Sequence, residues 1–551
     1  MLYDLLVIGS GIAGLRAAIE GSQRGLRVAL LSKGVFMRSN SSLACGGINA
    51  ALGNAEPDSP LIHFEDTLRG GDGLALKGAV QILCQEAPAE IGFLASIGVA
   101  FDQQDERIAQ RAFGGMGKKR TCYIGDKTGG AITQTLFRVI MQKYPIHWIK
   151  ERMLLSLLVH EGVISGITAL NRQTSEIELL GAKAVVLASG GYGGIYHEHH
   201  TNTPEITGDG QAAALRAGLR LSNMEFVQFH PTTLPRTHAL ISEAARGEGG
   251  ILINETGERF IDELLTRDKL ARKIAKELSE GRRVFLDVRH LGEALLERKL
   301  PSLLKIAMSE GINPIKEPIP IIPSVHYSMG GIECDLGGAT AIKGLYVAGE
   351  VACNLVHGAN RLGGNSLLES AVFGRIAGEN AAKFAQSHDY HDFRLEPIAK
   401  DTNLIEHILR GENRYNFQSI RKTLGKTLYE KAGIFRTQEG LHGALDYVSY
   451  LKRIWIGCHC IHKQKEYNSE LQAILELRNM LEVSEAMLLS ALAREESRGA
   501  HFREDFPEKN EKLFGTPSFV RKLESGRLYM EFEPKEGTKG WLNRLKKRLT
   551  R

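Results

Sequence analysis

The 551-residue sequence contains no apolar run of the ~18 residues that a membrane-spanning helix needs. Its seven cysteines show no framework spacing, which excludes a disulfide-rich secreted scaffold and favours reduced thiols. The net charge is only +5, and no basic stripe with interleaved aromatic residues suggests nucleic-acid binding. The N-terminus lacks the basic region of a signal peptide. These absences predict a cytoplasmic protein, with peripheral attachment to a membrane through partners left open.

Glycine, in contrast, is abundant: 60 residues, about 11% of the chain against a usual share of roughly 7%. Several glycines are doubled, as at 46–47, 190–191 and 330–331, which suggests backbone held close to a ligand. The length predicts two to four domains in total.

The first forty residues predict a dinucleotide-binding unit. An apolar strand at 3–8 is followed by a GxGxxG turn at 9–14, a helix and a second strand that ends in Ser32-Lys33. The glycines permit a tight turn and close approach of a pyrophosphate to the helix N-terminus. No acidic residue ends the second strand, which favours FAD over NAD. A tight turn without a ligand is the alternative.

Two later segments repeat the pattern of an apolar strand that ends in small residues. They are AVVLASGG (184–191) and GLYVAGE (344–350), where Glu350 could accept hydrogen bonds from a sugar or ribitol hydroxyl. Each alone could be an ordinary core strand. Together with the first unit they predict one FAD domain that is interrupted by an insertion.

The sequence resembles the succinate dehydrogenase and fumarate reductase flavoprotein family, which also contains L-aspartate oxidase. The residues that carry the resemblance run in family order: SLACGGINAALGN (42–54), FGGMGKKRTCYIGDKTG (113–129), TGDGQAAALRAG (207–218), MEFVQFHPTTLP (224–235), SEAARGEGGILIN (242–254), HYSMGGIECD (326–335), HGANRLGGNSLLES (357–370) and ESRGAHFREDFPE (496–508).

The resemblance implies an α/β fold in which a Rossmann-like FAD-binding domain is interrupted by an α+β capping domain and followed by a helical bundle. The expected domains are FAD-binding (1–235 and 341–385), capping (236–340), helical (386–510) and a C-terminal tail (511–551). Helical spacing of apolar residues at 467–495 supports the bundle.

The family's substrates are four-carbon dicarboxylates. By similarity, Arg361 grips one carboxylate bidentately, His230 and His326 donate hydrogen bonds, and Ser242 supplies a hydroxyl. Arg267 would be the proton donor for fumarate reduction, reprotonated through Glu243 and Arg246. The segment between GERF and Arg267 is shorter than in many relatives, which weakens the alignment there. Closure of the capping domain would assemble the site.

The resemblance also implies the FAD contacts. The residues expected to make them are Gly9, Gly11, Ile12, Ala13, Gly14, Ser32, Lys33, Ser39, Asn40, Ser41, Gly46, Gly47, Ala188, Gly190, Asp209, Glu350, Ser366 and Leu367. Respiratory relatives usually carry a histidine, within RSHT, that bonds covalently to the flavin. Asn40 stands there in this chain and has no imidazole nitrogen. We therefore predict non-covalent FAD, which favours fumarate reduction over succinate oxidation.

L-Aspartate oxidase, which makes iminoaspartate for NAD biosynthesis, is the alternative within the family. Those enzymes carry a glutamate where this chain has Phe113, and a carboxylate holds a substrate ammonium far better than a phenyl ring. Phe113 therefore favours succinate and fumarate as substrates. A non-enzymatic flavin-fold scaffold is disfavoured because Arg267 and Arg361 are both present.

The C-terminal third leaves several alternatives open. Cys458 and Cys460, with two nearby histidines, are too closely spaced for an ordinary zinc site, so we predict structural thiols and no metal. The chain has no iron–sulfur cysteine run, so a separate iron–sulfur subunit is expected to carry electrons further. ESRGAHFREDFPE would lie near the substrate domain, or be a charged surface segment. The basic end at 537–551 would be a solvated tail or a short amphipathic helix.

Overall fold

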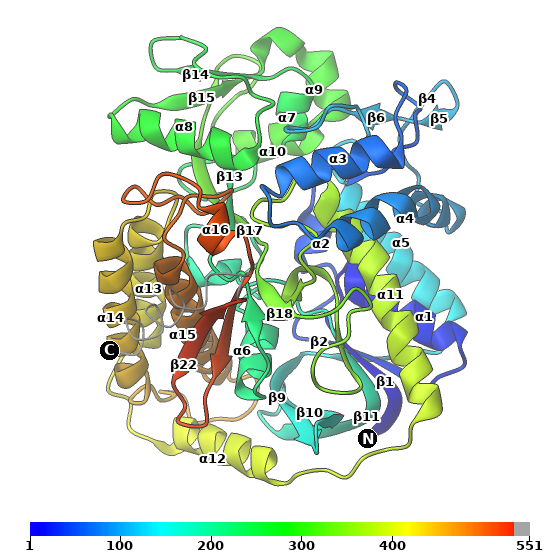
Figure 1. Cartoon of the computed structure of the whole chain (residues 1–551), viewed down its shortest axis with the longest axis vertical. Coiled ribbons are helices and arrows are strands. Elements are labelled where there is room, and N and C mark those ends of the chain that lie inside the picture. The colour runs from blue at the N-terminus through cyan, green and yellow to red at the C-terminus, as the bar shows by residue number, and fades with distance from the viewer. Residues whose placement is uncertain (534–551) are drawn as a thin grey trace.

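A computed structural model describes residues 1–533. These residues fold into three regions (Figure 1). A mixed sheet with helices packed on it forms the lower right, a smaller α+β region lies at the top, and a group of helices lies at the left. The basic segment 537–551, and with it the expectation of a tail or an amphipathic helix, lies outside the described residues. In the part of the chain that is described, no helix is long and apolar enough to span a membrane.

The central sheet follows the pattern expected for a dinucleotide-binding domain. β1 is apolar and almost wholly buried, as a strand covered on both faces must be. β1 pairs in parallel with β2 and β11, and β8 pairs in parallel with β2. In order, the strands are β8 (His147–Lys150), β2 (Val28–Ser32), β1 (Leu2–Ile8), β11 (Ile177–Leu187), β10 (Val163–Asn171) and β9 (Arg152–His160).

The segment at 344–350, which the sequence predicts to be a strand of the FAD domain, joins this sheet at the far end of β11. The first half of β11 pairs antiparallel with β10, and its last residues pair in parallel with β19 (Leu345–Val347). The sheet that begins at residue 2 is therefore completed about 340 residues later. This arrangement is the interrupted domain that the sequence predicts.

Helices cover the sheet around this junction. α1 (Ile12–Gln23) and α11 (Asn365–Ser387) lie side by side (Figure 1), because Gly374 and Gly378 of α11 rest directly on the backbone of Ala13 and Ala17. A Cβ atom at either glycine would lie within 2.6 Å of α1 backbone atoms. The remaining elements of this region are α3 (Pro60–Gly70), α4 (Lys77–Ser96), α5 (Thr128–Lys143), α6 (Asp209–Arg216), β3 (Ile48–Asn49), β4 (Gln103–Gln104), β5 (Arg107–Ile108), β6 (Gln110–Arg111) and β7 (Thr121–Cys122).

The upper region is inserted through two adjacent strands. β13 (Val227–Thr233) leads into it, β17 (Ile322–Ser328) leads out of it, and the two pair antiparallel. Its own apolar core lies among a small sheet and helices. These elements are α7 (Ala244–Gly247), β14 (Ile251–Asn254), α8 (Arg267–Ser279), β15 (Val284–Asp287), α9 (Glu293–Lys299), α10 (Pro301–Ser309) and β16 (Ile319–Pro320).

The helical region consists of α12 (Glu396–Arg410), α13 (Phe417–Lys431), α14 (Gln438–Trp455) and α15 (Ser469–Ala493). Residues 511–533, which the sequence analysis grouped with the C-terminal tail, form a short helix and a β-hairpin. After α16 (Glu511–Phe514), a hairpin of β21 (Ser518–Lys522) and β22 (Leu528–Phe532) extends a sheet of β12 (Leu221–Ser222), β18 (Gly331–Glu333) and β20 (Ala352–Cys353). Pairing with β12 satisfies backbone groups of β21, and Phe519 and Val520 are buried.

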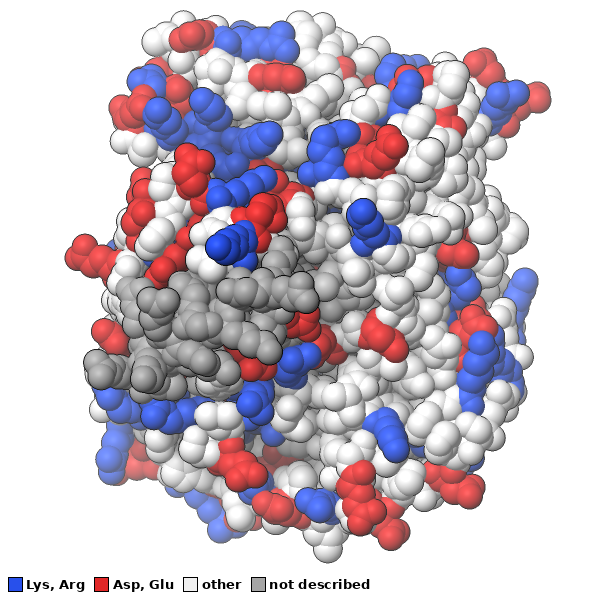
Figure 2. All heavy atoms as spheres, viewed as in Figure 1, with Lys and Arg blue, Asp and Glu red and all other residues white. Residues whose placement is uncertain are grey.

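The surface carries no dominant charge on the face shown in Figure 2, where basic and acidic side chains are interspersed. This agrees with the small net charge of the sequence.

Candidate active site

The glycine turn at residues 9–14 has the geometry that a bound pyrophosphate needs. Gly9 has φ +118°, and a Cβ atom there would lie 2.1 Å from the carbonyl oxygen of Ala188. A Cβ atom on Gly14 would lie 1.8 Å from the carbonyl oxygen of Gly9, so only glycine lets α1 pack this closely on the turn. The N-terminus of α1 consequently faces the end of the sheet, where an anion is favoured.

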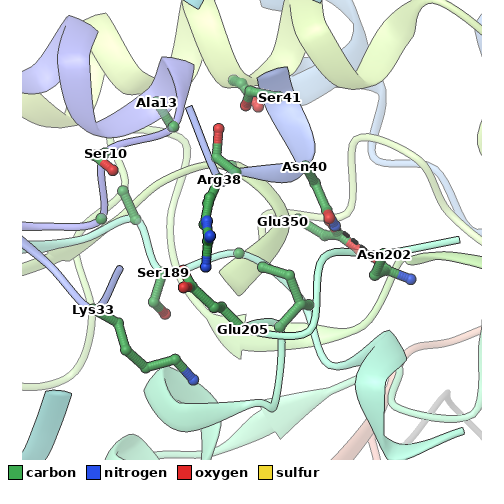
Figure 3. Close-up of a pocket in the computed structure, with 18 of the residues that line it drawn as sticks. Ser10, Ala13, Lys33, Arg38, Asn40, Ser41, Ser189, Asn202, Glu205 and Glu350 are labelled. Carbon is green, nitrogen blue, oxygen red and sulfur yellow. Dashed lines mark hydrogen bonds between the residues drawn. The ribbon is translucent and has the colours of Figure 1, made fainter. Parts of the chain in front are cut away.

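A cavity lies at this point and collects most of the predicted cofactor contacts. The predicted residues that line it are Gly9, Gly11, Ala13, Ser32, Lys33, Ser39, Asn40, Ser41, Ala188, Gly190, Asp209, Glu350, Ser366 and Leu367. Figure 3 also shows Arg38, Ser189, Asn202 and Glu205, which the sequence analysis did not select. Arg38 and Glu205 point toward one another within the cavity. The wall also reaches His326, so the cavity adjoins the predicted substrate residues.

Four predicted cofactor residues do not line this cavity: Ile12, Gly14, Gly46 and Gly47. The glycine pair packs against protein atoms. A Cβ atom on Gly46 would lie 2.7 Å from the ring of Phe113, and one on Gly47 would lie 2.4 Å from the Thr121 methyl group. Close packing on Phe113 and Thr121 therefore explains the pair without a ligand.

Asn40 lies at the start of a short helical turn, α2 (Asn40–Leu43), whose N-cap is Ser39. Its amide nitrogen donates to the side chain of Asn202 at 2.5 Å, and its amide oxygen accepts from the backbone of Thr203 at 3.0 Å. Asn40 thus joins α2 to the loop at 201–203 across the cavity rim (Figure 3).

Two charged groups at the cavity have clear partners. Lys33 Nζ lies 2.8 Å from Asp209 and 3.0 Å from Glu476, and although burial lowers the pKa of Lys33, these carboxylates raise it above its ordinary value. Glu350 accepts hydrogen bonds from the backbone and hydroxyl of Ser328. Burial nevertheless raises the pKa of Glu350 to about 7.

The cavity fits FAD on observations of its own. The hydroxyl of Ser189 and the amide nitrogen of Asn202 line it, are buried, and have no further hydrogen-bond partner among the described residues. The N-termini of α1 and α11 both face it, so backbone N–H groups are available for phosphate oxygens.

The predicted catalytic residues form a buried cluster next to this cavity. Glu243 Oε2 accepts from Arg267 Nη2 at 2.6 Å and from Arg267 Nε at 2.9 Å, and its Oε1 lies 3.7 Å from Arg246 Nη2. The backbone N–H of Gly114 donates to the same carboxylate at 2.9 Å. Arg361 completes the cluster and is 2% exposed.

This cluster carries excess positive charge. The guanidinium groups of Arg246 and Arg267 lie against the single carboxylate of Glu243, and the Arg361 guanidinium is joined to that of Arg267 through the Gln228 amide. Nε and Nη2 of Arg246 and Nε of Arg361 are buried and have no hydrogen-bond partner among the described residues. Because a buried unpaired donor is costly, these atoms are available for an anionic ligand with several oxygen atoms.

The pKa values follow from the same arrangement. Burial raises the pKa of Glu243, but the Arg267 and Arg246 guanidinium groups outweigh it and lower the value to about 2, so Glu243 stays ionised. Burial, followed by the charge of Arg267, lowers the pKa of Arg361 to about 10. The Arg361 guanidinium therefore stays cationic at neutral pH.

His230 and His326 lie together beside the arginines, with ring centroids 5.0 Å apart. Burial, and then the charge of Arg267, holds the pKa of each imidazole well below its ordinary value. Each ring is therefore neutral near pH 7 and can donate one hydrogen bond. Thr201 Oγ1 lies 2.7 Å from His326 Nδ1 and fixes that ring.

The other two predicted substrate residues are also buried here. Ser242 is 5% exposed, and its hydroxyl accepts a hydrogen bond from the backbone of Ala244 at 3.2 Å. Phe113 is 2% exposed and packs between Gly46 and Gly363. The structure thus brings the eight predicted catalytic and substrate-binding residues into one region.

Sequence reasoning missed Gln228. Its amide oxygen accepts from Arg267 Nη1 at 3.2 Å and from Arg361 Nη2 at 3.1 Å, and its amide nitrogen donates to the carbonyl of Arg361 at 2.7 Å. The sequence pattern could have identified it, because Gln228 precedes His230 by two residues in β13, and residues two apart in a strand face the same side. The Arg361 guanidinium also lies 4.2 Å from the ring centroid of Tyr327.

The cysteines near residue 460 lie away from this site. Cys458 and Cys460 are buried in the core beside the helical region, and burial raises the pKa of each thiol to about 11. Within residues 1–533, no group of three or more histidine, cysteine or acidic side chains is placed to hold a metal ion.

Comparison with known proteins gives consistent results along the whole chain. A family model described as an FAD binding domain matches residues 4–367, and one described as the fumarate reductase flavoprotein C-terminus matches residues 421–544. The chain is 38% identical to a succinate dehydrogenase flavoprotein subunit of Rickettsia bellii, over 97% of this chain and 95% of that protein. It is 39% identical to a fumarate reductase flavoprotein subunit of Mycobacterium tuberculosis, over 97% of each chain. Its structure superposes on a variant of E. coli quinol fumarate reductase with a TM-score of 0.92, at 36% identity over 97% and 96% of the two chains.

Proposed function

This chain belongs to the succinate dehydrogenase and fumarate reductase flavoprotein family, and from that premise we propose how its residues carry out the reaction. It is the FAD-dependent flavoprotein subunit of such an enzyme and acts on succinate and fumarate. One observation carries our proposal for the site: three buried guanidinium groups balanced by one carboxylate, an excess of positive charge that suits a dicarboxylate dianion.

We assign substrate binding to side chains whose hydrogen-bond donors are free to contact a ligand. Arg361 binds one carboxylate, and the neutral rings of His230 and His326 each donate a hydrogen bond to the substrate. Ser242 supplies a further hydroxyl. Phe113 presents an apolar surface to the methylene carbons. Because the cluster is buried, these charged contacts act without competition from water.

Proton transfer is assigned to Arg267. Bound FAD supplies hydride transfer to or from one substrate carbon. In fumarate reduction, Arg267 holds a proton against the other carbon, and Glu243 and Arg246 return a proton to it. Glu243 suits this role because it contacts both arginines and stays ionised. A guanidinium is a weak acid, so it needs this fixed geometry and a neighbouring carboxylate to act.

The cofactor is held without a covalent bond. The residue that matches the family's flavin-linking histidine is Asn40, whose amide has no nucleophilic ring nitrogen and is already bonded to Asn202 and Thr203. Covalent attachment generally raises the flavin potential in the family. Its absence favours fumarate reduction as the direction of turnover.

The L-aspartate oxidase alternative is not favoured. The relatives reported above are named succinate dehydrogenase and fumarate reductase. In the site, Phe113 stands where a carboxylate would be needed to hold a substrate ammonium.

The wider organisation follows from the family. Several relatives are named as subunits, so this chain works with partner subunits. We assign electron transfer beyond the flavin to an iron–sulfur subunit, because the sequence lacks a cysteine run for a cluster.

Residues 236–340 act as the capping domain, since they carry Ser242, Glu243, Arg246, Arg267 and His326. We place the protein in the cytoplasm, held at the membrane only through its partners.

The mode of FAD binding is tested by denaturing the purified yellow protein and separating chain from supernatant. We expect all the flavin absorbance in the supernatant. Flavin that remains with the chain would contradict non-covalent binding. On the same preparation, the rate of fumarate reduction by a reduced viologen dye should exceed that of dye-linked succinate oxidation, and the opposite ratio would overturn the assigned direction.

The role of Arg267 is tested with Arg267→Ala. Turnover of fumarate should disappear while the flavin content stays at that of the unchanged protein. Arg283→Ala, an exposed arginine of the same region, is the matched control and should keep full turnover. Substantial turnover by Arg267→Ala would remove this residue from the mechanism.

A further inference from the structure

Arg272 connects the helix that starts with Arg267 to the C-terminal part of the chain. Both residues lie on α8, and Arg267 is its first residue. Arg272 Nη1 donates to the carbonyl of Gly499 at 2.7 Å, and its Nη2 donates to Asp268 at 2.7 Å. Its guanidinium also lies 5.3 Å from the ring centroid of Phe502. One fork-shaped side chain therefore fixes the first turn of α8 against residues that follow α15.

Gly499 also packs closely against the loop that carries Arg361. Gly499 has φ +51°, and a Cβ atom there would lie 2.4 Å from the carbonyl oxygen of Ala359. The next residue, Ala500, donates its backbone N–H to that carbonyl at 2.9 Å. Ala359 is fully buried and precedes Arg361 by two residues. Residues 499 and 500 thus set the position of the backbone that places Arg361.

The segment that makes these contacts is held by buried charges. We call residues 496–503 the brace. Arg498 bonds to Glu496 through Nε at 2.8 Å and Nη2 at 3.0 Å, and both side chains are completely buried. Arg498 and His501 exchange backbone hydrogen bonds of 2.8 and 2.9 Å, which closes a tight turn around Gly499. Gly499 N–H also donates to Asp72 at 2.7 Å.

Buried ion pairs of this kind lose much of their attraction to desolvation, so they add little to stability. Removing one partner is costly, however, and each pair therefore restricts the segment to one arrangement. A charged surface segment with local salt bridges, the ordinary alternative for this sequence, would be exposed. Arg494, Glu496, Arg498 and Arg503 are each at most 2% exposed.

The contacts form a closed circuit around the substrate site. From Arg267 it runs along α8 to Arg272, through Gly499 and Ala500 to Ala359 and Arg361, and back to Arg267 through the amide of Gln228. We propose that Arg272 is a positioning residue, and that through it the brace sets the distance between Arg267 and Arg361. The inference rests on the functions proposed above for these two arginines.

Positioning matters here because the two arginines belong to different regions of the chain. Arg267 lies in the capping region, whereas Arg361 follows β19 of the FAD-binding sheet. An error of about 1 Å in the placement of a catalytic group can reduce a rate on the order of 100-fold. The brace contacts both regions at adjacent residues, so it fixes their relative position without touching substrate.

The test uses three variants of the FAD-loaded protein with measurement of kcat and KM for fumarate. Arg272→Met should lower kcat roughly 10–100-fold with little change in KM, because Arg267 is displaced and Arg361 is not. Arg272→Lys keeps the charge but cannot hold Asp268 and Gly499 with one planar fork, so its kcat should be intermediate. Gly499→Ala should instead raise KM about tenfold, because its methyl group displaces Ala359.

Two substitutions serve as matched controls. Lys273→Met changes the exposed neighbour of Arg272 on α8. Gly443→Ala adds a methyl group in α14 where no atom lies within 4 Å. Both should leave kcat and KM unchanged. The proposal fails if Arg272→Met keeps the original kcat. It also fails if every loss of activity is matched by an equal loss of bound FAD, which would indicate a purely structural role.

A separate readout distinguishes this proposal from the function on which it rests. Succinate binding to the oxidised protein is followed by the change in flavin absorbance, which requires no turnover. Gly499→Ala should weaken succinate binding about tenfold, and unchanged binding would count against the brace. If the unchanged protein failed to reduce fumarate, the proposed function would fall, while the binding comparison would still decide the role of residue 499.

Discussion

The amide of Gln228 joins the two arginines on which the site depends. Its oxygen accepts from Arg267 and Arg361, and its nitrogen donates to Asn360 and to the carbonyl of Arg361, so every polar atom of the amide is in use. Such an uncharged group can hold two cations in place without neutralising the charge that the substrate requires. Glu at this position would cancel part of that charge.

Gln228→Leu therefore leaves two buried guanidinium groups short of one acceptor. We expect kcat/KM for fumarate to fall roughly 10–100-fold, since each unsatisfied buried donor costs on the order of 1–3 kcal/mol. FAD content should stay constant. Steady-state kinetics at fixed pH measures the effect, with Gln104→Leu, an exposed glutamine, as the control. A change of less than twofold would show that the arginines do not need this amide.

At the scale of elements, α10 depends on a residue that is distant in sequence. Leu300 stands at its N-cap and its side chain has no hydrogen-bond acceptor, but the Asp126 carboxylate accepts from the backbone N–H of Ser302 at 2.8 Å and of Leu303 at 3.2 Å. Asp126 lies just before α5 of the FAD-binding region. It thus caps a helix of the inserted region from outside.

Asp126→Ala should loosen α10 from the FAD-binding region. Loss of a capping carboxylate costs about 0.5–2 kcal/mol, which corresponds to a roughly 2–30-fold larger population with α10 detached. Limited proteolysis within residues 291–312 should accelerate by a similar factor. Asp389→Asn, at an exposed position, is the control and should leave cleavage unchanged. Equal cleavage of Asp126→Ala and the unchanged protein would refute the capping role.

These elements also show what a sequence can predict. The strand, glycine turn and helix at the N-terminus depend on neighbouring residues, so their pattern is local and was predicted correctly. The sheet that contains β12, β18, β20, β21 and β22 joins strands of two to five residues from distant parts of the chain, which leaves no periodicity to detect. Likewise, motifs supplied Arg267 and Glu243, whereas the hydrogen bond of Arg272 to Gly499 spans 227 residues and depends on packing alone.

For the whole molecule, buried histidines predict the response to acid. His63, His230 and His501 are at most 1% exposed, and burial lowers the pKa of each, to about 4 for His63. Below the ordinary value of about 6.5, the unfolded chain binds protons that the folded chain does not. Stability should therefore fall as pH drops below 6.5, by up to about 1.4 kcal/mol per pH unit for each such group. The lowered pKa of Glu243 also makes stability fall with decreasing pH, but only below the ordinary glutamate pKa of about 4.5.

Thermal unfolding between pH 7.5 and 5 measures this effect. The midpoint temperature should be nearly constant above pH 7 and should decline below pH 6.5. His63→Gln, which cannot take up the proton, should decline less steeply. A midpoint that is independent of pH over this range would contradict the assignment of neutral buried histidines.

The late pairing of β19 with β11 has a consequence for how the protein is made. A ribosome delivers the chain from its N-terminus, and the glycine turn emerges within the first residues. The cavity beside that turn still lacks Glu350, Ser366 and Leu367 until nearly 370 residues have been synthesised. All of the inserted region is translated before then. FAD can consequently be captured in full only by a nascent chain that has already produced its cap, so the order of translation makes flavin loading a late step of biogenesis.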